Sequence, residues 1–79
     1  MKVRLRYFAA LRELLGRDRE EREVAAGATP RALLLEILGP PRAAHAASVA
    51  FAVNSEHAAP DRPLRDGDEV AFLPPLSGG

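Results

Sequence analysis

One amphipathic segment, residues 30–38, constrains the fold of this 79-residue chain more than any other. Thr29 and Pro30 form a strong helix start, because threonine favours the N-cap position and proline the first helical position. Four apolar residues then recur at helical spacing before Gly39-Pro40-Pro41 ends the pattern: Leu33, Leu34, Ile37 and Leu38. The pattern predicts a helix with a single apolar face, which the rest of a short chain has to cover.

Segments at the two ends of the chain alternate apolar and polar residues with the period of a β-strand. In residues 1–8 one face is charged and the other carries Val3, Leu5 and Tyr7. In residues 69–73 the same alternation leaves Leu73 on the outer face. Phe8 also falls on an outer face by this pattern, where a large apolar ring has no core to join. Phe8 is therefore either a contact residue or the point where the chain turns inward.

The segments between these strands carry weaker signals. A leucine triplet at helical spacing predicts a short amphipathic helix that ends at Gly16: Leu11, Leu14 and Leu15. Residues 18–24 are almost all charged, which suits a loop followed by an exposed edge strand. An alanine-rich connection follows the main helix and leads to a strand over residues 49–53. Residues 55–68 predict turns around a short strand or a single helical turn, with Leu64 returning to the core.

This order of elements predicts an α+β fold, since it suits neither a helical bundle nor an all-β sandwich. The most economical arrangement is a small mixed sheet with one face on the main helix, the β-grasp fold, whose first and last strands run parallel at the centre. Residues 1–75 would form this domain and residues 76–79 a flexible tail. The carboxyl ends of the two central strands then lie side by side, so Phe8 and Leu73 would form one apolar patch where the tail leaves the sheet.

The composition excludes several classes of function. The 11 basic residues balance 11 acidic ones, so no basic field attracts nucleic acid or an anionic membrane. The absence of cysteine excludes a disulfide, a thiolate nucleophile and a thiolate metal site. The amino end lacks the apolar core of a signal peptide, and no apolar run reaches the roughly 20 residues that cross a bilayer. We therefore expect a cytoplasmic protein with no nucleic-acid or membrane partner.

The last six residues carry the clearest chemical pattern. Pro74-Pro75 blocks continuation of the last strand, because proline has no backbone N–H to donate. Gly78 and Gly79 have no Cβ, so their backbone can extend into a channel too narrow for side chains and present a terminal carboxylate to another protein. An ordinary frayed terminus is the alternative explanation.

Other polar residues have simpler explanations. His45 and His57 each lack a second ligand at metal spacing, although His57 could contact a partner. We expect three acidic residues around an Asp-Gly turn to cap the turn and stay solvated, without a metal: Asp66, Asp68 and Glu69. Arg4 and Arg6 lie on the solvated face of the first strand, or they pair with acidic groups of a partner beside the apolar patch.

With this tail, the chain resembles the ubiquitin-like sulfur-carrier proteins, and among them the family of molybdopterin synthase small subunits. The resemblance begins with Phe8-Ala9 and Arg12-Glu13-Leu14 and continues with Val53-Asn54. Its most specific block runs from Leu64 to Phe72 and then through Pro-Pro-Leu-Ser-Gly-Gly, residues 74–79. The resemblance spans nearly the whole chain, although residues 16–48 contribute only helix and strand pattern.

The resemblance implies a function in which no side chain of this chain is catalytic. An ATP-using E1-like adenylyltransferase would convert the Gly79 carboxylate to an acyl-adenylate, and sulfur would replace AMP to give a thiocarboxylate. The thiocarboxylate would donate sulfur to cyclic pyranopterin monophosphate in molybdenum cofactor biosynthesis. Four tail residues would insert into the large subunit of molybdopterin synthase, in a heterotetramer with two of each subunit: Pro75, Leu76, Ser77 and Gly78. The interface would consist of Phe8, Leu73 and His57, and the chain itself would hold no cofactor or metal.

Two alternatives share the same tail chemistry. One is a sulfur carrier for thiamine thiazole or a thiolated tRNA base, although carriers for thiamine are usually shorter. The other is a ubiquitin-like protein modifier, in which a lysine of a target attacks the activated Gly79. Because Lys2 is the only lysine, chains of this protein on itself would be restricted. A binding module without a covalent role would make Gly78 and Gly79 dispensable.

Overall fold

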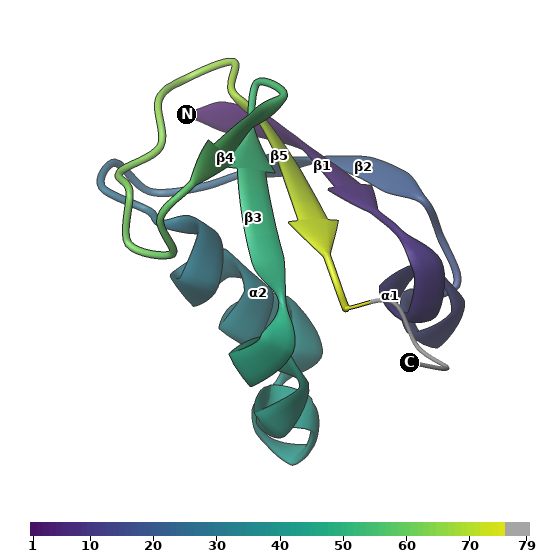
Figure 1. Ribbon diagram of the computed structural model, residues 1–79. Helices are drawn as coiled ribbons and strands as arrows, with labels where there is room; N and C mark the ends of the chain where they lie inside the picture. The colour runs from purple at the N-terminus through teal and green to yellow at the C-terminus, as the bar shows by residue number, and fades with distance from the viewer. Residues whose placement is uncertain (76–79) are drawn as a thin grey trace.

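The computed structural model describes residues 1–75, which form a five-stranded mixed sheet and its covering helices (Figure 1). The strand order across the sheet is β2-β1-β5-β3-β4. Strands β1 (Lys2–Tyr7) and β5 (Glu69–Leu73) are parallel neighbours at the centre, with Arg4 opposite Glu69 and Tyr7 opposite Phe72. The predicted α+β fold, with its first and last strands parallel at the centre, is confirmed.

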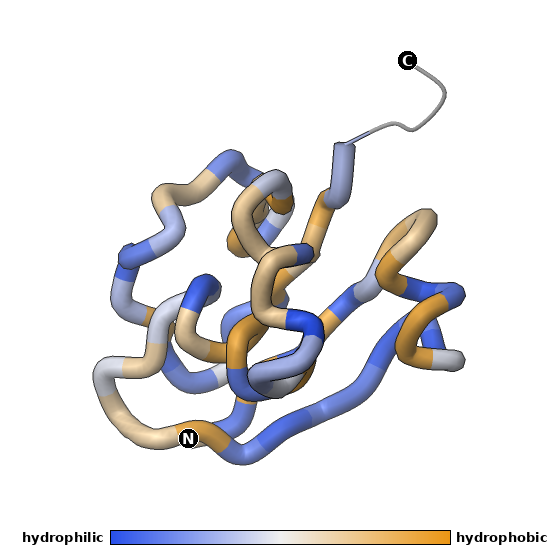
Figure 2. The backbone as a smooth tube through the Cα atoms, turned by 90° about the horizontal axis from the view of Figure 1, so that it is seen from below, coloured by the Kyte–Doolittle hydropathy of each residue, from blue (hydrophilic) through white to orange (hydrophobic). Residues whose placement is uncertain are grey.

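The outer strands are all antiparallel to their neighbours. On one side, β2 (Arg19–Glu23) pairs with β1, and its uniformly hydrophilic sequence forms a continuous blue run in Figure 2. On the other side, β3 (Ala50–Val53) pairs with β5, and β4 (Glu56–Ala58) closes the sheet. The β3–β4 loop has only two residues, Asn54 and Ser55, both with positive φ (53° and 68°). Such a turn matches the twist of paired strands, so it supports a tight hairpin.

The helices begin and end largely where the sequence predicts. In α1 (Ala9–Leu15), Gly16 adopts a left-handed conformation with a φ of 74° and ends the helix. Helix α2 (Pro30–Leu38) begins at Thr29, whose side chain accepts a hydrogen bond from the backbone N–H of Ala32 (3.2 Å). The alanine-rich connection is instead a 3₁₀ helix, η1 (Pro40–Ser48), none of whose residues is fully buried. The sequence did not predict this element because it carries no row of large apolar side chains and none of its residues is fully buried.

The core lies between the sheet and α2, and an aromatic contact links its central strands. Phe72 is fully buried, stacks on Tyr7 (5.6 Å between ring centroids) and meets Phe51 edge-on (5.8 Å). Helix α2 contributes Leu33, Leu34 and Leu38 to the same core. Leu64 is buried as predicted, and the backbone N–H of Leu64 donates to the Ala28 carbonyl (2.8 Å). This core fixes β1 and β5 side by side, which determines where the chain leaves the sheet.

Candidate partner-binding site at the carboxyl ends of the central strands

The two central strands finish at the same edge of the sheet. Tyr7 opposite Phe72 is the last pair of the β1–β5 ladder. After this pair, Phe8 serves as the N-cap of α1, while Leu73 leads into Pro74 and Pro75, the last described residue. Phe8 and Leu73 therefore follow neighbouring strands at one edge, as the sequence predicts. The tail residues predicted to act in chemistry or insertion lie outside the described residues: Leu76, Ser77, Gly78 and Gly79.

On the outer face of the sheet beside this edge, β5 and β3 present small or apolar side chains. Leu73 is 36% exposed, on the face opposite to buried Phe72. In one row across the sheet, Ala71 lies opposite Ala52, and Ala52 lies opposite His57. Directly opposed residues share a face, so two small side chains separate His57 from the β1 side of the sheet. His57 is exposed on the edge strand, three strand spacings from β1, which is roughly 14 Å. A partner must cover a broad surface to contact His57 and Phe8 together.

Phe8 has a contact within its own chain as well as an exposed part. Its side chain is half-buried, and the guanidinium carbon of Arg6 lies 5.1 Å from the centroid of its ring. A guanidinium at this distance is attracted to the negative face of the ring. The two alternatives for Phe8 thus combine, because the ring turns partly inward yet stays accessible. We call the surface formed by Arg6, Phe8, Ala71, Leu73 and His57 the tail-exit face.

An apolar groove of about 350 Å³ opens where the chain leaves the sheet, and the sequence did not reveal it. Pro74 and Pro75 line it together with α1, which contributes Ala10, Leu11 and Leu14, and with His45, Ser48 and Val49. Leu14 is 38% exposed although its helical spacing assigned it to an apolar face. The sequence offered one indication that Leu14 would stay exposed. Helix α1 has only seven residues, and so short a helix buries only Leu11. The exit segment therefore has an apolar wall to which a partner side chain can bind.

A polar cluster supports the end of β1 from the helix side. The Tyr7 hydroxyl donates to a carboxylate oxygen of Glu20, and the Arg17 Nε–H donates to the same oxygen (3.0 Å). Burial raises the pKa of the Tyr7 phenol, and the neighbouring Glu20 carboxylate raises it further. Burial also raises the pKa of Glu20, but the hydrogen bonds from Tyr7 and Arg17 outweigh it and hold that pKa below its usual value. Tyr7 thus stays protonated, and its hydroxyl joins the end of β1 to β2.

The acidic turn at the other end of β5 differs from the prediction at one residue. Asp68 is buried (7% exposed), not solvated, and its carboxylate accepts from the Arg65 backbone N–H (2.8 Å) and the Asn54 side-chain amide (2.9 Å). The Nη1 atom of Arg62 lies 3.6 Å from the Oδ2 atom of the same carboxylate. Burial raises the Asp68 pKa, but these donors and the nearby arginines outweigh it and lower the pKa overall. The prediction failed because Leu64 and Val70 enter the core on either side and carry the turn inward.

Residues 1–75 contain no obvious centre for metal chemistry. Among them, no group of three or more histidine, aspartate or glutamate side chains is arranged to hold a metal ion. His45 and His57 are both exposed. Over the same residues, no helix has the length and apolar character needed to span a membrane. The distinctive features of this part of the chain are the two surfaces that flank the exit of the tail.

Comparisons with known proteins agree along the whole chain. The model of the ThiS family matches residues 5–79. The molybdopterin synthase sulfur carrier subunit of Chlamydomonas reinhardtii is 40% identical over 87 residues, which cover all of both chains. The subunit of the same name from Escherichia coli is 35% identical, over 98% of this chain and 99% of its own.

Solved structures resemble this chain over a similar share of its length. SAMP1 from Haloferax volcanii superposes with a TM-score of 0.79 at 27% identity, and all of both chains is covered. A complex of subunits 1 and 2 of the molybdopterin-converting factor from Helicobacter pylori contains a chain that matches with a TM-score of 0.66 at 26% identity, again over both full chains. These similarities support the β-grasp fold. In the Helicobacter pylori structure, the two subunits of the factor form a complex.

Proposed function

The chain belongs to the ThiS family, and on that premise we propose that it is the sulfur carrier subunit of a molybdopterin synthase. The observation that carries this proposal is the 40% identity to the Chlamydomonas reinhardtii subunit across all of both chains. The fold supports it, because the central strand β5 ends beside an exposed face and leads through Pro74-Pro75 toward Gly78-Gly79. Gly79 is the covalent site in this proposal. The product of the synthase is molybdopterin, the ligand that holds molybdenum in the cofactor.

The chemistry takes place at the Gly79 carboxylate. An E1-like adenylyltransferase binds ATP, the carboxylate oxygen attacks the α-phosphorus, and pyrophosphate leaves to give an acyl-adenylate. A nucleophile with sulfur at the oxidation level of sulfide then attacks the glycyl carbonyl carbon, AMP leaves, and loss of a proton gives a thiocarboxylate. In the large subunit the thiocarboxylate sulfur attacks the pyranopterin substrate and forms a carbon–sulfur bond. Water then attacks the glycyl carbonyl carbon, the acyl–sulfur bond breaks, and the Gly79 carboxylate is regenerated while the sulfur stays on the product. This route requires no cysteine on the carrier, in accord with a sequence that has none.

In this proposal the large subunit is the partner that binds the pyranopterin substrate and supplies the catalytic side chains. The Helicobacter pylori complex supports such a partner, because it joins subunits 1 and 2 of the molybdopterin-converting factor. In our proposal the large subunit contacts Phe8, Leu73 and His57 while Pro75 and residues 76–78 enter its active site, with two copies of each subunit in the complex. The activating enzyme uses the same face in turn, so each interface has to be moderate in strength and reversible.

Deletion of Gly79 tests the proposal directly. We expect the truncated protein, and a variant with one alanine added after Gly79, to fold normally and to deliver no sulfur. The assay combines the carrier with its activating enzyme, a sulfur source and the large subunit, and measures molybdopterin formation and the intact mass of the carrier. Thiocarboxylate formation adds roughly 16 Da by replacing oxygen with sulfur. Product formation by the truncated carrier would contradict the proposal.

A second candidate function is protein modification, and the likeness to SAMP1, a small archaeal modifier protein, favours it. In that function a lysine amine of a target attacks the activated Gly79 carbonyl and forms an isopeptide bond. Lys2 is the only lysine of this chain and lies at the amino end of β1, at the far edge of the sheet from the exit of β5. Covalent adducts of the carrier on other proteins, with no mass gain on the free carrier, would favour this second function.

A further inference from the structure

One position on the outer face of the β1–β2 ladder breaks the charge pattern of its neighbours. Two cross-strand pairs on this face join opposite charges: Lys2 with Glu23, and Arg4 with Glu21. The third pair places Arg6 opposite Arg19. Like charges directly opposite each other destabilise a sheet, so this pair works against the fold. Of the three pairs on this face, the arginine pair is the one nearest to Phe8 and to the exit of the tail.

No other part of the described chain neutralises this arginine pair. On the β5 side, Arg4 lies opposite Glu69, but Arg6 lies opposite Ala71. Neither Arg6 nor Arg19 forms an ion pair within residues 1–75. The Nε atom of Arg6 is buried and has no hydrogen-bond partner in the same part of the chain. Glu20, the nearest residue along β2, is already engaged by Tyr7 and Arg17.

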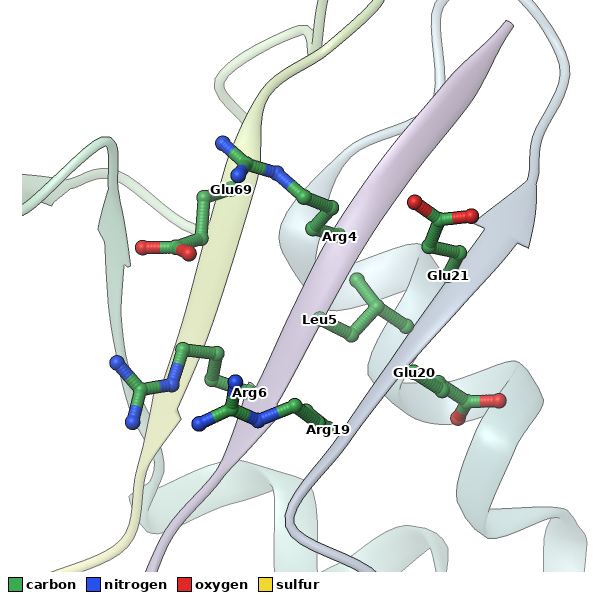
Figure 3. Close-up of a pocket in the computed structure, with 7 residues that line it drawn as sticks. All are labelled: Arg4, Leu5, Arg6, Arg19, Glu20, Glu21 and Glu69. Atoms are coloured by element: carbon green, nitrogen blue, oxygen red, sulfur yellow. The ribbon is translucent and has the colours of Figure 1, made fainter.

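The arginine pair lies in a surface pocket of about 270 Å³. Figure 3 shows the side chains of Arg4, Arg6 and Arg19 on one face of the sheet, reaching toward β5. Glu21 and Glu69 also line this pocket. The pocket continues into the tail-exit face, because the guanidinium of Arg6 lies against the ring of Phe8. A protein that covers Phe8 and Leu73 therefore reaches the arginine pair as well.

We propose that Arg6 and Arg19 together bind a carboxylate from an acidic segment of the protein that engages the tail. Each guanidinium presents a planar fork of donors that matches a carboxylate, and one anion between the two removes their repulsion. A carboxylate of a flexible protein segment fits this pocket better than the phosphates of a nucleic acid. Glu21 and Glu69 repel further negative charge along the edges of the pocket, and the other side chains of such a segment can turn away from them. The 11 basic and 11 acidic residues also provide no wider basic surface for a nucleic acid.

The identity of this partner rests on the proposed function, in which the large subunit engages the tail, whereas the carboxylate site itself does not. The first experiment therefore uses a free probe. Hexaglutamate is titrated into the ¹⁵N-labelled protein, and the side-chain Nε–H signals of its arginines are followed by NMR. We expect the Arg6 and Arg19 signals to shift together, and the Arg6 shift to disappear in Arg19→Gln. Arg42, exposed on η1 and without an ion pair in residues 1–75, provides the reference signal.

The second experiment measures binding of the full-length carrier to the large subunit. We expect Arg6→Gln and Arg19→Gln each to weaken binding about tenfold, since each removes a charge-assisted contact. Arg6→Lys keeps the charge but loses the fork, so it should restore only part of the affinity. Arg42→Gln should bind like the wild type. Circular dichroism and urea unfolding confirm that each variant is folded before binding is compared.

Three results would overturn the proposal. The first is equal hexaglutamate shifts at Arg42 and at the arginine pair, which would indicate screening without a site. The second is a larger response to a six-nucleotide single-stranded DNA than to hexaglutamate, which would indicate a nucleic-acid phosphate as the ligand. The third is unchanged binding of both glutamine variants to a large subunit that binds the wild type. If the wild type does not bind the large subunit, the proposed function fails, and the hexaglutamate titration alone decides the carboxylate site.

Discussion

The two ends of the central strand β5 differ in how completely the chain satisfies its own polar groups. At the start of β5, the carboxylate of Asp68 receives two hydrogen bonds, and the amide oxygen of Asn54 accepts from the Glu69 backbone N–H (3.0 Å). At the finish, Leu73 is exposed and the Arg6–Arg19 pair has no counter-ion within residues 1–75. The chain therefore satisfies its own polar groups at the start of β5, whereas the arginine pair at the finish has no counter-ion in the part of the chain that the structure describes.

Backbone hydrogen bonds strengthen this contrast. At the start, the Arg4 N–H donates to the Asp68 carbonyl (2.9 Å), and the Asn54 N–H donates to the Glu69 carbonyl (2.8 Å). The Lys2 N–H also donates to the side chain of Asp66 (2.8 Å). At the finish, Pro74 and Pro75 have no N–H to donate, so the ladder cannot continue along the exit segment. A partner can therefore engage that segment without breaking a hydrogen bond that supports the fold.

The largest expected effect comes from Asp68→Ala at the start of β5. The substitution leaves the Arg65 backbone N–H and the Asn54 side-chain amide without their acceptor, which should cost about 2–3 kcal/mol of unfolding free energy. Urea unfolding followed by circular dichroism measures the loss. Asp61→Ala, at an exposed position in the preceding loop, is the matched control and should change stability little. If both variants were equally stable, the start of β5 would not be the region that holds the fold together.

Leu73→Ala should produce the opposite outcome at the finish of β5. Leu73 is 36% exposed, so its truncation should reduce the unfolding free energy by less than about 1 kcal/mol. Binding to the large subunit should weaken about tenfold, because an apolar anchor of the interface is lost. Isothermal titration calorimetry measures the affinity. Leu35→Ala provides a control, since Leu35 is similarly exposed (39%) but lies on α2. Equal binding losses in the two variants would argue against a partner at the tail-exit face.

Acidification should lower the free energy of unfolding by a smaller amount than Asp68→Ala does, and it should act at the start of β5. The folded state lowers the pKa of Asp68, so the stability that this carboxylate contributes is present above its ordinary pKa of about 4. That contribution is lost as the pH falls through the lower folded pKa, because protonation removes the charge that accepts the hydrogen bonds. Glu20, whose pKa is also lowered, acts in the same direction. Urea unfolding between roughly pH 5 and pH 2 should show a shallower decline for Asp68→Asn than for the wild type. Parallel curves would exclude Asp68 as a source of the acid sensitivity.

The sequence predicts most of the fold because its strong patterns coincide with buried elements. Thr29-Pro30 and the leucines after it identify α2, and the alternation in residues 69–73 identifies β5, since burial selects apolar residues at these positions. The 3₁₀ helix η1 was missed because none of its residues is fully buried. Asp68 was wrongly expected to stay solvated, since its burial depends on how the turn packs and not on the Asp-Gly sequence.

The candidate site could be predicted only where local sequence determines it. Parity along the two strands identified Phe8 and Leu73, and the parallel pairing of β1 with β5 places them at one edge. The Arg6–Arg19 pair could not be found in this way, because it depends on the register between β1 and β2. The groove beside Pro75 likewise requires α1 and η1 to meet the exit segment, a long-range arrangement that no local pattern encodes.

Arg19→Glu should change stability least of these substitutions. It also tests most directly whether the two ends of β5 differ in charge complementarity. A carboxylate at position 19 would make the third cross-strand pair complementary, like the pairs of Lys2 and Arg4, and should raise the unfolding free energy by about 0.5 kcal/mol. The same change would occupy Arg6 from within the chain and repel an acidic partner, so binding to the large subunit should weaken.

A gain in stability coupled to a loss in binding would mean that the finish of β5 sacrifices stability for recognition. The coupling is specific to Arg6, so in an Arg6→Gln background the same Arg19→Glu substitution should give little or no stabilisation. Urea unfolding of the four proteins in this cycle isolates the pair from any change in strand propensity at position 19. If Arg19→Glu stabilised both backgrounds equally, repulsion between the arginines would not be the cause. The two ends of β5 would then differ in burial and hydrogen bonding but not in charge.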